Sequence, residues 1–98
     1  MQLIFADEKL TANSERGQWI GDIACPMIDT KLKKVVVERV FVVPEYRGHG
    51  IAAQLMQALV DHAREEHWQL EIMCPYAKKW FQLHTEAQDV LFKAQHNE

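Results

Sequence analysis

The segment Arg47-Gly48-His49-Gly50-Ile51-Ala52 has residue types suited to binding an anion. Its glycines stand where a β-branched run gives way to a helical pattern, so a ligand could approach the backbone closely. Free N–H groups and the dipole at a helix N-terminus favour phosphate, and Arg47 could add charge-assisted hydrogen bonds. A tight strand-to-helix turn that merely needs glycine explains the same pattern. The missing Gly-Lys-Ser/Thr excludes a P-loop, and the missing third glycine excludes a Rossmann fingerprint.

Cys74 is the second candidate, because it lies between a short apolar segment and Pro75. Proline is common at the first helical position, which makes Cys74 the expected N-cap, where the helix dipole favours a thiolate. The alternative is a small buried hydrophobic residue, which is our interpretation of Cys25. The two cysteines form no Cys-x-x-Cys pair, and no histidine stands at zinc-finger spacing beside them. We therefore expect neither a structural metal site nor a disulfide framework.

The surrounding sequence predicts the elements that would position both segments. Residues 35–43 are a β-branched run typical of a long central strand, and residues 50–66 repeat apolar side chains every fourth position, as a helix does. With a short strand over 69–73 they predict a βαβ unit with parallel strands. The other expected elements are early antiparallel strands within 3–6 and 19–28, turns over 7–18 and 29–34, a short helix over 76–83 and a last helical piece over 87–95. His84 would either approach the site or cap the helix over 76–83.

Length and composition bound the classes of protein to which the chain can belong. The 98 residues predict one domain spanning 1–98, with 48% hydrophobic and 26% charged residues. The net charge of −3 argues against non-specific nucleic-acid binding. No apolar run approaches the roughly 20 residues of a membrane span, and the N-terminal segment lacks the basic region of a secretory signal. We therefore expect a cytoplasmic protein, monomeric or weakly dimeric, with reduced cysteines and no nucleic-acid or membrane partner.

Arg47, Gly50 and Ala52 fit the pattern Q/R-x-x-G-x-G/A, and with the flanking strand and helix this segment resembles motif A of the GNAT acetyltransferase superfamily. Residues 70–84 are similar to the C-terminal signature of its short, stand-alone branch, the YjdJ-type N-acetyltransferases. The resemblance covers about residues 17–91. Two positions depart from the branch: Thr85 stands where it has proline, and Arg39 stands where many members have a strand histidine. The second departure removes a candidate base, since arginine is not a base at neutral pH.

The resemblance implies a fold, a cofactor and a set of site residues. The fold would be a minimal GNAT fold of the α+β (α/β) class, a mixed and mostly antiparallel sheet with a central βαβ unit and flanking helices. The cofactor would be acetyl-CoA, with its pyrophosphate on the amides of residues 47–52 and its pantetheine arm lying along the strand before the loop, as an added strand does. The implied cofactor-binding residues are Phe41, Val42, Val43, Arg47, Gly48, His49, Gly50, Ile51, Ala52, Cys74 and Tyr76, and no metal is implied.

The implied reaction is acetyl transfer from acetyl-CoA to an amine acceptor, which is a small molecule or a protein side chain or terminus. Cys74 is the candidate catalytic residue, either as an acyl-accepting nucleophile or as a group that orients the thioester. Direct transfer would need a base, for which Glu38 and Glu71 are candidates by chemistry alone. Residues 7–18 leave no room for the early helices that shape the acceptor site in longer relatives, so the acceptor cleft should be open. The alternatives are an acyl-CoA-binding or sensing module with little or no catalysis, and a structural subunit that uses the fold alone.

Overall fold

Two small sheets meet along one continuous segment of chain, and this arrangement organises the molecule. The computed structural model describes residues 1–93. One sheet has the strand order β1-β2-β3-β6 and is antiparallel throughout, and the other has the order β4-β5-β7. Their strands are β1 (Gln2–Ala6), β2 (Lys9–Asn13), β3 (Trp19–Ala24), β4 (Met27–Asp29), β5 (Lys34–Val37), β6 (Arg39–Val42) and β7 (Gln69–Ile72).

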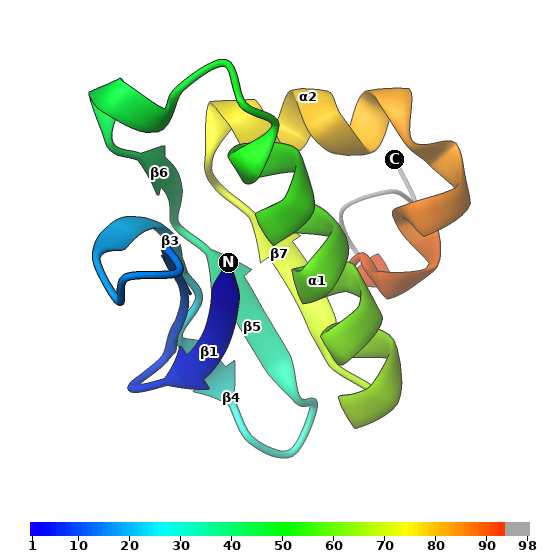
Figure 1. Ribbon diagram of the computed structural model, residues 1–98. Helices are drawn as coiled ribbons and strands as arrows, with labels where there is room; N and C mark the ends of the chain where they lie inside the picture. The colour runs from blue at the N-terminus through cyan, green and yellow to red at the C-terminus, as the bar shows by residue number, and fades with distance from the viewer. Residues whose placement is uncertain (94–98) are drawn as a thin grey trace.

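The long strand expected over residues 35–43 is two strands, β5 and β6. The strand is interrupted at Glu38, and the segments before and after it join different sheets. β5 pairs in parallel with β7, which confirms the βαβ unit, whereas β6 pairs with β3. The carbonyl of Val37 accepts hydrogen bonds from the N–H groups of Met73 and Cys74, at 3.0 and 3.2 Å. Beyond this point β6 and β7 diverge (Figure 1), and among residues 1–93 no strand pairs with the second edge of β6.

One strand of the structure, β2, was not predicted, and the single strand expected over 19–28 is divided into β3 and β4. Residues 7–18 were expected to be a turn, but Leu10 and Ala12 are fully buried while their neighbours in β2 are not, which is the period of two of a half-buried strand. Asp7 and Glu8 connect β1 to β2 with φ values of 54° and 62°, as a tight hairpin turn requires. The expected antiparallel pairing is confirmed between residues 19–28 and 35–43, where β3 pairs with β6 and β4 with β5. It is wrong for the first strand, because β1 pairs with β2 and not with β3.

Helix α1 (Ile51–Glu66) is the predicted amphipathic helix and crosses in front of β7 in Figure 1. Its residues Ile51, Leu55, Leu59 and Ala63 are buried, so the four-residue repeat faces the core. The helix ends at His67, whose φ of 60° is left-handed and whose N–H bonds to the Ala63 and Arg64 carbonyls, a common helix C-cap. None of the helices within residues 1–93 combines the length and hydrophobicity needed to cross a membrane.

Helix α2 (Pro75–Leu83) begins at the expected proline, with Cys74 as its N-cap. At its other end, His84 is the C-cap of the helix. Its Nδ1 lies 2.8 Å from the Trp80 carbonyl oxygen, and its ring stacks on the Trp80 indole with centroids 4.0 Å apart. Of the two roles expected for His84, the structure supports capping. Both ends of α2 are therefore fixed, and its first turn is held beside the diverging strands.

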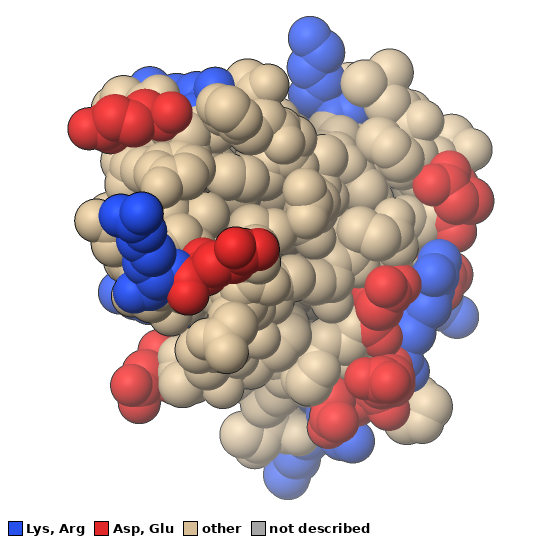
Figure 2. All heavy atoms as spheres, viewed as in Figure 1, with Lys and Arg blue, Asp and Glu red and all other residues tan. Residues whose placement is uncertain are grey.

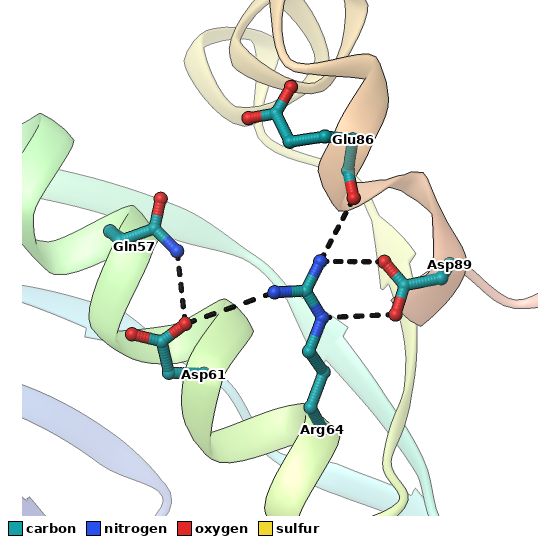
Figure 3. Close-up of polar contacts among 5 residues, drawn as sticks. All are labelled: Gln57, Asp61, Arg64, Glu86 and Asp89. Carbon is teal, nitrogen blue, oxygen red and sulfur yellow. Dashed lines mark hydrogen bonds and ion pairs between the residues drawn. The ribbon is translucent and has the colours of Figure 1, made fainter.

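The C-terminal segment is attached to α1 through Arg64. The last helical piece expected over 87–95 is instead the 3₁₀ segment η2 (Thr85–Val90), and residues 94–95 of that prediction lie outside the described residues. Figure 3 shows the Arg64 guanidinium donating to both carboxylate oxygens of Asp89, at 2.8 and 3.0 Å, and to the Glu86 carbonyl at 2.9 Å. A two-pronged arginine–carboxylate pair restrains orientation as well as distance, so η2 is held in one position on α1.

Candidate functional site

The loop between β6 and α1 presents an open backbone at the start of a long helix. After the short turn η1 (Pro44–Tyr46), Gly48 and Gly50 have φ values of 83° and 77°, and Gly50 is the N-cap of α1. A Cβ built on either glycine would meet no atom of the described residues within 4 Å. The α1 N-terminus has no side-chain cap in the structure, so its first N–H groups are available to a ligand. These are the features that an anion-binding helix N-terminus requires.

The loop forms one wall of a cleft of about 260 Å³ whose other walls are the end of β6 and the start of α2. The cleft is lined by Val42, Tyr46, Arg47, Gly48, Gly50, Ile51, Ala52, Ala53 and Tyr76. All but Tyr46 and Ala53 are among the residues that the resemblance implies for cofactor binding. Sequence reasoning missed these two, although both adjoin the motif.

Of the three strand residues predicted to bind the cofactor, Val42 directs its backbone toward the cleft. The N–H of Val43 donates to the Ile20 carbonyl at 2.9 Å, and so faces β3. Because successive backbone groups of a strand alternate in direction, those of Phe41 also face β3 and those of Val42 face away from it. Consistent with this, the Val42 carbonyl accepts a hydrogen bond from Nε of Arg47 at 2.8 Å.

The side chains of Phe41 and His49 lie apart from the cleft. The Phe41 ring stacks on Trp19, with centroids 5.6 Å apart, on the face of its sheet opposite the buried Val42. His49 lines a second hollow, of about 350 Å³, together with Glu45 and Tyr46. The face of the molecule that carries α1 shows acidic and basic side chains intermixed, without a continuous basic surface (Figure 2).

Cys74 lies where β6 and β7 begin to diverge, and it is hydrogen-bonded to Val37. Its side chain is buried and makes no capping hydrogen bond to α2, and its N–H donates to the Val37 carbonyl. The pKa of the Tyr76 phenol is raised, first by partial burial and then by the charge of a Cys74 thiolate. Tyr76 lines the cleft, whereas Cys74, which the resemblance also implies for cofactor binding, is not among the lining residues.

Acid–base groups are scarce at this site. The cleft lining contains no carboxylate or imidazole in the described part of the chain. Glu71 is bound to the Lys34 ammonium at 2.7 Å, whereas Glu38 is exposed at the break between β5 and β6. Arg39 donates to both oxygens of the buried Asp22 carboxylate, at 3.0 and 3.2 Å. No group of three His, Cys, Asp or Glu side chains that could hold a metal occurs within residues 1–93.

A family model described as GCN5-related N-acetyl-transferase matches residues 14–90. The chain belongs to the GCN5-related N-acetyltransferase family. This confirms the expected GNAT fold and makes the protein an acetyltransferase of that family, whose cofactor is acetyl-CoA. No curated protein matches the chain.

Solved GNAT structures superpose on this chain to different extents. A GCN5-like protein from Staphylococcus aureus matches with a TM-score of 0.73 at 22% identity, covering 93% of this chain and 87% of its own. The ribosomal-protein-alanine N-acetyltransferase of Brucella melitensis matches with a TM-score of 0.64 at 26% identity, over 76% of this chain and 58% of its own. The Escherichia coli GNAT N-acetyltransferase YhbS, crystallised with CoA, matches with a TM-score of 0.59 at 29% identity, over 66% of this chain and 38% of its own.

Proposed function

We propose that this GNAT protein moves the acetyl group of acetyl-CoA to an amine, and that the cleft between β6, the glycine loop and α2 holds the cofactor. The loop carries this proposal, because the positions that Cβ atoms would fill at Gly48 and Gly50 are open, so a phosphate can reach the backbone. The backbone of Val42 would bind the pantetheine arm as an added strand. The Cys74-Pro75-Tyr76 segment supports membership of the short, YjdJ-type branch.

The transfer breaks the bond between the acetyl carbon and sulfur and forms a bond from that carbon to the amine nitrogen. The amine loses a proton, and the departing thiolate gains one. Tyr76, whose phenol lines the cleft and is an ordinary proton donor at neutral pH, would supply that proton. Cys74, beside it, acts at the acetyl group. It does so either by accepting the group first, which releases CoA before the amine attacks, or by orienting the thioester for direct attack.

Calorimetric titration and intact-protein mass spectrometry with acetyl-CoA test this proposal. The wild-type protein should bind acetyl-CoA, and Cys74→Ala should bind it within a few-fold but lose turnover. A mass increase of one acetyl group in the wild type, absent from Cys74→Ala, would identify the covalent route. Cys25→Ala is the matched control, because its thiol is also buried but lines a separate hollow with Phe5 and Trp68. The proposal fails if the wild type does not bind acetyl-CoA, and the role of Cys74 fails if its alanine variant keeps full activity.

The second candidate is an acyl-CoA-binding or sensing module with little or no catalysis. It is favoured by the lack of a carboxylate or imidazole in the cleft lining and by the engagement of Arg39 with Asp22. A panel of small amines and of peptides with free N-termini or lysine side chains distinguishes the two candidates. Turnover with any of them supports the enzyme, whereas tight acetyl-CoA binding without turnover across the panel supports the sensor.

A further inference from the structure

We infer that Arg47 is a positioning residue, which fixes the free edge of β6 and the start of the glycine loop in one arrangement. Its contribution to CoA binding then comes through the backbone that meets the pantetheine arm, and not through its charge on the pyrophosphate. The inference rests on the proposed cofactor site and concerns a residue whose obvious role would be that of a phosphate ligand.

The side chain of Arg47 is already engaged with the protein. Its Nε donates to the Val42 carbonyl at 2.8 Å, and its guanidinium carbon lies 5.5 Å from the centroid of the Phe41 ring. A guanidinium is planar and weakly hydrated, so it stacks favourably on an aromatic face. With Nε and the planar face engaged, only the terminal N–H groups remain for a phosphate, and they can meet one only from this fixed position.

The ring beneath Arg47 is itself held in place. Phe41 stacks on Trp19 at an interplanar angle of 10°, and the guanidinium of Arg39 also lies 5.5 Å from its centroid. Arg39 is fixed in turn by both oxygens of Asp22, which is 3% exposed. A buried carboxylate, a second arginine and two aromatic rings thus form a rigid support for Arg47.

The hydrogen bond from Arg47 to Val42 fixes the backbone at the free edge of β6, where we propose that the pantetheine arm binds. Val43 donates its N–H to β3, and Arg47 orients the Val42 carbonyl, so the peptide plane between residues 42 and 43 is held from both sides. A carbonyl oxygen has two lone pairs, and the Val42 carbonyl can therefore still accept a bond from a ligand. Since Arg47 also begins the glycine loop, one side chain connects the two halves of the proposed site. Lysine cannot replace it, because it lacks the Nε–H donor and the planar group.

Comparing CoA with pantetheine, which lacks the pyrophosphate, tests the inference. We expect Arg47→Met and Arg47→Lys each to weaken CoA binding about tenfold, as loss of a charge-assisted hydrogen bond does. Pantetheine binding, followed by NMR titration of the Val42 amide, should weaken by the same factor, and the salt dependence of CoA binding should not change. Phe41→Leu should weaken the binding of both CoA and pantetheine. Arg16→Met should weaken the binding of neither, because Arg16 is exposed and lies outside the cleft.

Two results would overturn the inference while leaving the cofactor site intact. One is near-wild-type CoA affinity in Arg47→Lys, which would show that charge alone suffices. The other is a loss confined to CoA with a flatter salt dependence, which would make Arg47 a phosphate ligand. If the wild-type protein binds no CoA at all, the cofactor proposal fails first and this inference fails with it.

Discussion

Gly50→Ala tests the glycine loop with the smallest change that adds a side chain. At a φ of 77°, Gly50 is in the left-handed region, where a Cβ costs about 1–2 kcal/mol. No described atom lies within 4 Å of that Cβ, so no steric clash adds to this cost. The lower entropy of the unfolded alanine chain returns about 0.4–1 kcal/mol. We therefore expect a net loss of about 1 kcal/mol in the free energy of unfolding, with the fold retained.

The effect of Gly50→Ala on CoA should be much larger than this loss of stability implies. Its new methyl group projects into the open side of the loop, where we place a phosphate, and loss of a hydrogen bond to a charged group costs about 1.5–3 kcal/mol. Calorimetry should therefore show CoA affinity reduced at least about tenfold. Gly17→Ala is the matched control, because Gly17 has a φ of 82° and equally open surroundings but lies outside the cleft.

Urea unfolding of both variants, followed by circular dichroism, completes the comparison. Gly17→Ala should lose about the same stability as Gly50→Ala and bind CoA like the wild type. The reasoning is refuted if Gly50→Ala binds CoA normally. It is also refuted if both variants lose affinity equally, because backbone strain and not a blocked phosphate site would then be responsible.

Two predictions concern stability against pH. Burial is the main cause that raises the pKa of the Cys25 thiol from 9.0 to about 11. Above pH 9 the thiol therefore loses its proton more readily in the unfolded chain than in the folded one. The free energy of unfolding should fall by roughly 2–3 kcal/mol by pH 11. Urea midpoints across this range should decline less steeply in Cys25→Ala, and an equal slope would contradict the assignment. The hydrogen bond from Arg64 lowers the pKa of Asp89 below 3.8, so their pair stabilises the fold above that pH and loses its effect on acidification through the lowered pKa. Asp89→Asn should lower Tm at pH 7 but not at pH 2, and an equal drop at both values would show that the charge is not involved.

Features with a local cause could be predicted from the sequence. The four-residue apolar repeat defined α1, Pro75 marked the start of α2, and the glycines of the loop adopt the positive φ that only glycine tolerates easily. The family motif follows from the same local pattern, because it describes a backbone conformation next to a helix N-terminus. The loop residues that line the cleft could therefore be predicted without a structure, whereas His49, predicted with them, lies apart from it.

Features that depend on pairing between distant segments could not be predicted. The run of residues 35–43 is β-branched on both sides of Glu38, and only the partners of its two halves, β7 and β3, explain the break. The register of β6 on β3 decides that Val42 faces the cleft, and no residue type reveals a register. Likewise Asp22 and Arg39 meet only because β3 and β6 are neighbours.

The free edge of β6 also bears on how the protein behaves at high concentration. An unpaired strand edge is a template on which a strand of another molecule can assemble, and natural sheets limit this with short edge strands and charged side chains. β6 has four residues, and the guanidinium side chain of Arg47 is bonded across the edge at the Val42 carbonyl. We therefore expect the short length of β6 and the charged side chain beside it to disfavour pairing with a whole strand of another molecule, while a slender ligand can still reach the Val42 backbone.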